Sequence, residues 1–587
     1  MDTFAAPTDQ IVRALVTAGI GEVLATPAFD GIGLDAVRDV IEGFGRLAAD
    51  VIAPTDRIGD RAGARLDPVT GAVTVPDELV AAYREYIAGG WTALAAPAEL
   101  GGGGLPGCVG TAVHEMFGSA NMSLSINPML TQSAIELLER WADERQREVY
   151  VRRMIEGRWT GTMNLTEPEA GSDLGAVRAT ARPLPDGRWA VTGTKIFITW
   201  GEHDLRENII HLVLARAPEA PAGTKGISLF LVPKVLVDDD GALLERNHVR
   251  CIGIEHKLGI HASPTCVLQF DEAVGELVGP LHGGMAAMFS MMNPARLHVG
   301  VQGTSTGERA LQQAIAYATE RVQGRAPGAA TPSSPIIDHP DVRRMLVDIA
   351  TTVDACRLLT YTTAVAGDLA QHATDADARE AAQVRADLLT PLTKAWPTDQ
   401  GVRMASLAVQ VHGGMGFIEE TGVAQRLRDS RIAPIYEGTN GIQAIDLVGR
   451  KVARDGGRAI GALFDEIAAT AGATAAHPEL AGVADALTAA LQTARAATAW
   501  VLDRFTTAPA EVLAGATAYL ELVSLVTAGH LLARQALADL AAAEAAAPVS
   551  SARCRFFALE HLGRTPTLAA ITAGPDLATA GLALDRA

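Results

Sequence analysis

Cysteine and basic residues are scarce in this chain of 587 residues. Its cysteines are odd in number, scattered and never spaced as CxxC, which excludes a disulfide framework and a zinc site; they are Cys108, Cys251, Cys266, Cys356 and Cys554. We therefore predict no metal centre. Lys and Arg number 49 against 68 Asp and Glu, a formal net charge of -19. Because nonspecific nucleic-acid binding needs a basic surplus, no nucleic-acid partner is expected.

The chain also lacks the signs of a targeting signal and of a membrane span. Its N-terminus MDTFAAPTDQ has an acid at position 2 and no basic region ahead of an apolar core. We therefore expect a cytoplasmic protein without a secretory signal. The longest apolar stretch, 512–534, is interrupted by Glu521 and His530. This predicts a buried core helix and no integral membrane insertion.

What is present is an ordinary globular composition with a pattern that changes along the chain. The length suggests about four domains. Along the chain, apolar residues first recur at helical spacing, then fall in short β-like runs, and then return to helical spacing. Asp186-Gly187 between two β-like runs indicates a hairpin. We predict an α+β multidomain fold with an N-terminal helical domain, a central antiparallel β domain, a helical bundle domain and an additional C-terminal helical domain, at 1–160, 161–275, 276–455 and 456–587.

Three segments carry candidate binding residues. The loop MNLTEPEAGSDLGA (163–176) suits a polar cofactor, or is an irregular strand-to-turn connection. TGTKIFITWGEH (192–203) offers Phe197 for stacking and Thr199 for a hydroxyl hydrogen bond, or is an ordinary strand end. QVHGGMGF (410–417) lets backbone approach a ligand, or is a turn.

A fourth segment, RIAPIYEGTNGIQ (431–443), places one carboxylate, Glu437, before a run of Gly, Thr, Asn and Gly. From the local sequence alone, Glu437 is a candidate cap of a helix that begins near Ile442.

Taken together, five motifs resemble the acyl-CoA dehydrogenase family of flavoproteins in their order and spacing. They are MNLTEPEAGSD, TGTKIFIT, MMNPARL, QVHGGMGF and RDSRIAPIYEGTNGIQ, and the resemblance covers roughly residues 50 to 455. The stretch 320–345 and the extra C-terminal helices are similar to the larger bacterial members. That branch includes broad-range fatty acyl-CoA dehydrogenases and enzymes for 3-methylthiopropanoyl-CoA.

The resemblance implies a function for Glu437. In the family this carboxylate removes the proton α to a thioester, the β-carbon gives a hydride to N5 of FAD, and the product is a trans-2-enoyl-CoA. Electrons then pass to an electron-transfer flavoprotein. Some relatives carry the base just before the arginine of an earlier helix, but that position is Ala295 here, which cannot accept a proton. An acyl-CoA oxidase and a catalytically silent acyl-CoA-binding protein are the alternatives.

The resemblance also implies contacts for FAD and for the substrate. The flavin side is expected at Met163, Leu165, Thr166, Ser172, Phe197, Ile198 and Thr199, although many relatives have Trp at the place of Phe197. The pyrophosphate and adenosine are expected at Arg321, Gln410, Gly413 and Gly414 of a neighbouring subunit and at Thr439 and Gly441. The acyl-CoA is expected at Ser172, Asn293, Arg296, Tyr436 and Gly438. The acyl pocket is expected to be lined by apolar helix residues.

The assembly expected from the resemblance is a homodimer. Shorter family members resemble tetramers built as pairs of dimers, and the C-terminal helices of this chain have apolar faces that need to be covered. If these helices pack where the second dimer would pack, a two-fold symmetric homodimer results. The alternative is that they build a new intermolecular interface and a tetramer. Around Arg321 the chain reads RVQGR where shorter relatives read RKTFGK, and Pro340 stands where a glutamine is common.

Overall fold

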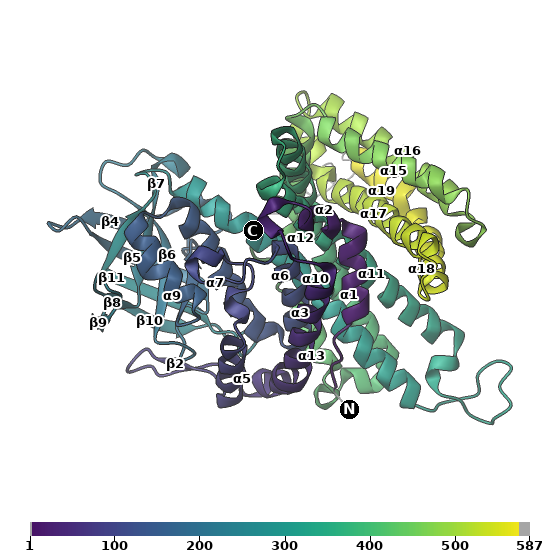
Figure 1. Cartoon of the computed structure of the whole chain (residues 1–587), viewed down its shortest axis with the longest axis horizontal. Helices are drawn as coiled ribbons and strands as arrows, with labels where there is room; N and C mark the ends of the chain where they lie inside the picture. The colour runs from purple at the N-terminus through teal and green to yellow at the C-terminus, as the bar shows by residue number, and fades with distance from the viewer. Residues whose placement is uncertain (1–2, 575–587) are drawn as a thin grey trace, which may run out of the picture.

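A computed structural model describes residues 3–574, and Figure 1 shows its helical and β parts side by side. Among the first helices, α7 (Met122–Trp141) lies between the sheet and the long helices of the bundle, whereas α1 (Thr8–Ala18) packs against the bundle helix α11 (Pro340–His372) (Figure 1). The main ones are α1 (Thr8–Ala18), α3 (Leu34–Leu47), α5 (Asp77–Ala88), α6 (Gly107–Ala120) and α7 (Met122–Trp141), with a two-stranded ribbon of β1 (Arg65–Leu66) and β2 (Val73–Thr74). Because almost every residue of α7 is buried, this helix sits at the centre of the molecule.

The β domain is built on a sheet of seven strands in the order β10-β11-β5-β4-β6-β3, with β7 paired to β11 and β6. The strands are β3 (Trp159–Asn164), β4 (Thr180–Pro183), β5 (Trp189–Thr199), β6 (Asn208–Arg216), β7 (Ile227–Pro233), β10 (Val249–Ile254) and β11 (Thr265–Val278), and β8 (Val235–Val237) pairs separately with β9 (Leu243–Arg246). The hairpin predicted at Asp186-Gly187 joins β4 to β5. The sheet is not purely antiparallel, because β3 runs parallel to β6.

The bundle consists of three long helices, α10 (Gly284–Glu320), α11 (Pro340–His372) and α12 (Ala376–His412), followed by α13 (Val423–Ser430) and α14 (Asn440–Asp446). Helix α11 buries Met345, Ile349 and Val353, which recur at helical spacing along one face. The connection 321–339 extends away from the bundle on the side opposite the β domain (Figure 1). Most of this connection, which is rich in Pro and Ser, is exposed.

The last helices pack on the bundle as a separate layer (Figure 1). They are α15 (Arg458–Thr474), α16 (Val483–Arg504), α17 (Pro509–Ala541), α18 (Ala547–Glu560) and α19 (Thr565–Ala573). By length and composition α17 is apolar enough to cross a membrane, but 72% of its most apolar window is buried inside the structure. It is thus the core helix that the sequence predicts. The five cysteines are buried and free, and no metal-binding cluster occurs among residues 3–574.

Candidate active site

The loop between α13 and α14 carries Glu437 in an uncommon backbone conformation. Glu437 has φ +54° and the next residue, Gly438, has φ +85°. A non-glycine residue in this region is strained, and such strain is concentrated at functional sites. The cap of α14 is Thr439, whose side-chain oxygen accepts a hydrogen bond from the Ile442 N–H at 3.2 Å. The alternative that Glu437 caps this helix is therefore wrong, and its carboxylate is available for another role.

A buried lysine fixes both ends of this loop. Lys394, on α12 and fully buried, donates hydrogen bonds from Nζ to the Ala433 carbonyl and to Asn440 Oδ1, both at 2.9 Å. The amide of Asn440 in turn donates to the Ala395 carbonyl at 3.1 Å and to Asp399 Oδ1 at 2.8 Å. This network holds the strained loop in place. Sequence reasoning missed Lys394, although a single lysine between two helix-interior prolines, in TPLTKAWP, is an unusual signal.

Burial and two cations set the protonation of Glu437. The side chain is half-buried, and loss of water raises its pKa above the ordinary range of a glutamate. The charges of Arg296 and then Lys394 act in the opposite direction and lower the Glu437 pKa. Burial also lowers the pKa of Lys394, to about 7. A carboxylate with a raised pKa is a better proton acceptor near neutral pH than an exposed one, as a general base requires.

Arg296 lies beside the same loop. It is 8% exposed, Nη1 is 3.4 Å from Asn293 Oδ1, and Nε has no partner among the described residues. A side chain placed on Gly438 would come within 2.9 Å of Gln443 Nε2 and 3.7 Å of an Arg296 Nη. Gly438 therefore lets the guanidinium and the Gln443 amide approach the loop closely. Of the other residues predicted here, Tyr436 and Gly438 are half-buried and Asn293 is exposed.

Helix α7 connects this loop to the β domain. The Tyr436 hydroxyl donates to Gln302 Oε1 on α10, and Gln302 Nε2 lies 3.4 Å from the sulfur of Met129 on α7. Two turns earlier on α7, the Ser123 carbonyl accepts from the Trp200 indole N–H at 3.2 Å, just past the end of β5. Six residues of helix span about 9 Å. The residue after β5 therefore contacts the same short stretch of α7 to which the Glu437 loop is linked through Gln302.

The β-domain wall contains the residues predicted for the flavin. Phe197, at φ +59°, is 58% exposed, whereas Ile198 and Met163 are buried and Thr199, Leu165 and Thr166 are half-buried. Glu167 fixes the loop that precedes Ser172, because its carboxylate accepts hydrogen bonds from Lys195 Nζ at 2.8 Å and from the Arg178 N–H at 2.7 Å. Ser172 itself is exposed. A large ring left exposed at a strand end suits stacking on a planar ligand.

Buried side-chain amide atoms without a hydrogen-bond partner lie both on the β-domain wall and beside the Glu437 loop. Asn164 Oδ1, at the end of β3, and both side-chain polar atoms of Gln443, next to the Glu437 loop, have no hydrogen-bond partner among the described residues. Buried polar groups are normally satisfied, so such atoms indicate a polar ligand. Together with the exposed ring of Phe197, they fit a flavin nucleotide.

The residues predicted for the far end of the cofactor form a separate group. The rings of Tyr317 and His412 stack with centroids 4.3 Å apart, which brings Arg321 and Gly413 to one end of the bundle. These residues, Gln410 and Gly414 are exposed, as are Thr439 and Gly441 at the start of α14. Gln410 lies 16 residues after Lys394 on α12, about 24 Å along the helix, and Lys394 binds the Glu437 loop. Within one chain the Arg321 group therefore lies far from Glu437.

Comparison with known proteins identifies the class to which this fold and site belong. Four family models match: "Acyl-CoA dehydrogenase, N-terminal domain" at 56–158, "middle domain" at 162–273, "C-terminal domain" at 282–452, and "Acetyl-CoA dehydrogenase C-terminal like" at 463–582. The protein is an oxidoreductase that acts on acyl-CoA.

Two curated relatives narrow the identification. The 3-methylmercaptopropionyl-CoA dehydrogenase of Ruegeria pomeroyi is 47% identical over 542 residues, with 91% of each chain covered. A broad-specificity linear acyl-CoA dehydrogenase of Mycobacterium tuberculosis is 35% identical over 562 residues, covering 92% of this chain and 91% of the relative. The chain belongs to the acyl-CoA dehydrogenase family.

Solved structures agree on the fold. The chain is similar to Caenorhabditis elegans ACDH-11 in complex with C11-CoA, with a TM-score of 0.79, 20% identity, and 95% and 92% of the two chains covered. It is also similar to an acyl-CoA dehydrogenase of Bacillus anthracis complexed with FAD, with a TM-score of 0.75, 20% identity, and 93% and 89% covered. Acyl-CoA dehydrogenases are FAD enzymes, and FAD is the cofactor of this protein.

Proposed function

We propose that this enzyme introduces a trans double bond between the α- and β-carbons of an acyl-CoA, with Glu437 as the base. The observation that carries the proposal is a carboxylate of raised pKa on a strained loop, beside Arg296 and held by Lys394. Ala295, the alternative position for a base, is an apolar residue. A silent acyl-CoA-binding protein would not need such a carboxylate, so catalysis is favoured over binding alone.

In the proposed reaction Glu437 takes the α-proton of the thioester. The backbone N–H of Glu437 donates a hydrogen bond to the thioester oxygen, where negative charge develops. Losing one such donor elsewhere costs about 10²- to 10³-fold in rate. Lys394 keeps the loop in the strained conformation that orients the carboxylate and the backbone N–H of Glu437 towards the thioester. Arg296 favours the ionised form of this carboxylate before proton transfer.

When bound, FAD supplies the acceptor for the hydride that leaves the β-carbon. We assign its ring to the wall formed by Met163, Leu165, Thr166, Phe197, Ile198 and Thr199. Ser172 is assigned to its phosphates and to the substrate, and Thr439 and Gly441 to its adenosine end. Asn293, Arg296, Tyr436 and Gly438 are assigned to the acyl-CoA.

The named relatives act on a short thioether acyl-CoA in one case and on a broad range of linear acyl-CoAs in the other. We propose a linear acyl-CoA substrate, a role in fatty-acid β-oxidation in the cytoplasm, and an electron-transfer flavoprotein as acceptor. An acyl-CoA oxidase remains the second candidate because it uses the same base. Rapid hydrogen peroxide formation under air, with no reduction of an electron-transfer flavoprotein, would favour the oxidase.

We further propose a homodimer in which one subunit completes the FAD site of the other. The end of the bundle that carries Arg321, Gln410, Gly413 and Gly414 also exposes a short apolar run, in which Phe417 is 87% exposed, Met415 48% and Ile418 44%. Clustered exposed apolar residues commonly mark an interface between subunits. A partner chain covering this end would supply the cofactor contacts that one chain does not assemble.

Light scattering after size exclusion is expected to give the mass of two chains. Phe417→Glu places a charge in the proposed interface, so it is expected to lower both the dimer fraction and the FAD content. Val69→Glu, at another highly exposed apolar residue on the β1–β2 turn, serves as the control and should leave both unchanged. A stable mass of four chains, or monomers that retain FAD, would overturn this assembly.

Arg296→Ala is expected to weaken substrate handling more than FAD binding. About tenfold more acyl-CoA should be needed for half-maximal flavin bleaching, since hydrogen bonds from a charged group contribute about 1.5–3 kcal/mol. Arg296 lowers the pKa of Glu437, and Glu437 acts only when ionised. Removing the arginine should therefore raise that pKa and move the acid limb of kcat/KM to higher pH.

The control is Arg454→Ala, at an exposed arginine in the segment after α14. It should leave both the bleaching curve and the pH profile of the wild type intact. Loss of FAD from Arg296→Ala with an unchanged substrate response would contradict the assignment of this arginine to the acyl-CoA.

A further inference from the structure

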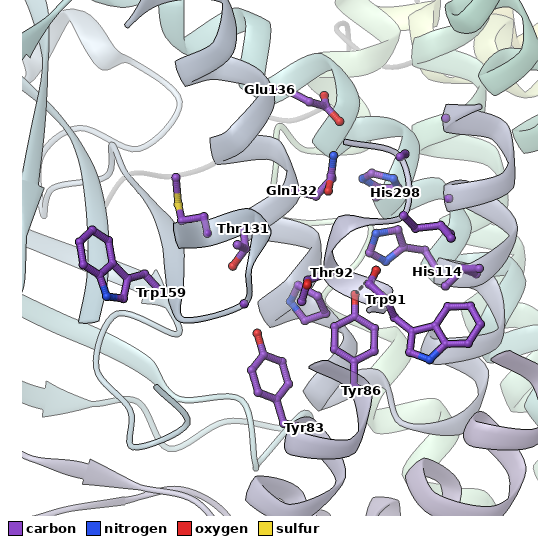
Figure 2. A pocket seen from close by; sticks show the side chains of 18 residues that line it. Tyr83, Tyr86, Trp91, Thr92, His114, Thr131, Gln132, Glu136, Trp159 and His298 are labelled. Atoms are coloured by element: carbon purple, nitrogen blue, oxygen red, sulfur yellow. Dashed lines mark hydrogen bonds between the residues drawn. The ribbon is translucent and has the colours of Figure 1, made fainter. Parts of the chain in front are cut away.

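A pocket with mixed polar and apolar walls lies between α5, α6, α7 and α10, and Figure 2 shows the side chains around it. The empty space in and around it is about 630 Å³, with the open solvent at its mouth included. One part of its lining is aromatic, with Tyr83, Tyr86, Trp91 and Trp159. The other part is polar, with His114, Gln132, Glu136 and His298.

The polar part of the lining contains an unused hydrogen-bonding group. The rings of His114 and His298 lie with centroids 4.4 Å apart and tilted by 50°. His298 is 8% exposed, and its Nδ1 has no hydrogen-bond partner among the described residues. Leaving a buried nitrogen without a hydrogen-bond partner has a free-energy cost. A ligand that donates to or accepts from this imidazole would remove that cost.

The pocket lies directly behind the wall of the proposed active site. Gln302, which accepts from the Tyr436 hydroxyl, is one helical turn from His298 on α10. Met129, which contacts Gln302, stands on α7 between Pro128 and Thr131, and both of these line the pocket. One turn of helix is about 5.4 Å. The Met129–Gln302 contact is thus a thin partition between the Glu437 loop and the pocket.

The titratable groups of the pocket carry little charge at slightly acid pH. Burial lowers the pKa of His114 to about 4 and the pKa of His298 well below its ordinary value, so both imidazoles are neutral. Burial raises the pKa of Glu136 to about 7, which leaves it largely protonated at slightly acid pH. A charged ligand group would lose its hydration here without a full opposite charge. A neutral group that both donates and accepts hydrogen bonds fits best.

We propose that this pocket binds the distal end of the acyl chain and favours chains with a hydroxyl group at that end. This inference rests on the proposed function, because it extends the substrate site of the same reaction. The acyl chain passes Gln302 and displaces the flexible side chain of Met129. Its terminal hydroxyl then exchanges hydrogen bonds with His298 and the Gln132 amide. A plain methyl end would leave His298 Nδ1 unpaired, which is the basis on which polar sites reject apolar analogues.

The test uses the FAD-loaded full-length enzyme under anaerobic conditions, with flavin bleaching as readout. Butyryl-CoA, plain acyl-CoAs of six to twelve carbons and the ω-hydroxyacyl-CoAs of the same lengths are compared. At one or two lengths the hydroxylated chain is expected to show at least a tenfold higher kcat/KM than the plain chain. The preference should be absent at shorter lengths, because the hydroxyl then stops short of the pocket.

Two variants locate the preference in this pocket. His298→Leu and Gln132→Leu should each lower the hydroxyl-to-plain ratio towards one, with each rate divided by that variant's own rate on butyryl-CoA. His256→Leu, the same change at an exposed histidine outside the pocket, should keep the wild-type ratio. Two variants on different helices keep the test valid if one of them does not fold.

The outcomes separate the inference from the function on which it rests. Bleaching by butyryl-CoA without a hydroxyl preference at any length overturns the pocket assignment alone. A preference that survives in both leucine variants overturns it as well. Failure of every acyl-CoA to bleach the flavin overturns the proposed function and this inference together.

Discussion

Glu437→Gln is expected to abolish reduction of the flavin by acyl-CoA, with a loss of about 10²- to 10⁴-fold or more. The amide has nearly the volume of the carboxyl group but does not accept a proton at neutral pH. Packing around the loop should therefore be preserved while proton removal is lost. The readouts are the rate of anaerobic flavin bleaching and the FAD content of the same sample.

The stability of this variant provides an independent check. Burial raises the pKa of Glu437 in the folded protein above its value in the unfolded chain. Ionisation of this carboxyl group as the pH rises therefore lowers the free energy of unfolding. Removing the ionisable group should leave the melting temperature at neutral pH unchanged or higher. Glu420→Gln, at an exposed glutamate of a neighbouring turn, should keep full activity. Near-normal turnover of Glu437→Gln would move the base to another residue.

Deletion of residues 456–587, the proposed additional domain, is expected to produce aggregates or larger assemblies in place of a clean dimer. Helix α17 packs against α11, and its Leu522, Val523, Leu525 and Val526 are fully buried. Removing the domain uncovers the apolar face that α17 protects on the bundle. Contiguous exposed apolar surface drives association.

Polar anchors that join the domain to the rest of the chain would be lost in the same deletion. His561 Nε2 lies 3.0 Å from Asp348, Arg553 pairs with Asp354, and Arg534 donates to the Thr17 carbonyl at 3.0 Å. Size exclusion with light scattering, run beside the full-length enzyme at equal concentration, measures the outcome. A truncated protein that stays dimeric, binds FAD and turns over would show that the domain is dispensable for assembly.

The parts of this fold that depend on local sequence were predictable. The Asp186-Gly187 hairpin and the buried face of α11 follow from turn chemistry and apolar spacing, which act over a few residues. Glu437 stood out because a lone acid in a glycine-containing loop is unusual. Its strained φ was not predictable, because the surrounding structure and not the local sequence imposes it.

The parts that depend on distant contacts were missed. Lys394 is 43 residues before Glu437, and its bonds to Ala433 and Asn440 exist only once α12 packs beside the loop. Gln302 and Met129 lie on different helices, so nothing in either segment indicates their contact. The parallel pairing of β3 with β6 and the polar pocket at His298 likewise arise from tertiary packing.

The most direct test of the central claim is an anaerobic titration of the FAD-loaded enzyme with butyryl-CoA, with products analysed at each addition. The account predicts that the oxidised flavin absorbance falls with added substrate and that one trans-2-enoyl-CoA forms for each flavin reduced. It also predicts loss of one α-proton from the substrate, with slower bleaching when the α-carbon carries deuterium. Binding of butyryl-CoA, or of any longer linear acyl-CoA, with the flavin left fully oxidised and no enoyl-CoA formed would contradict it.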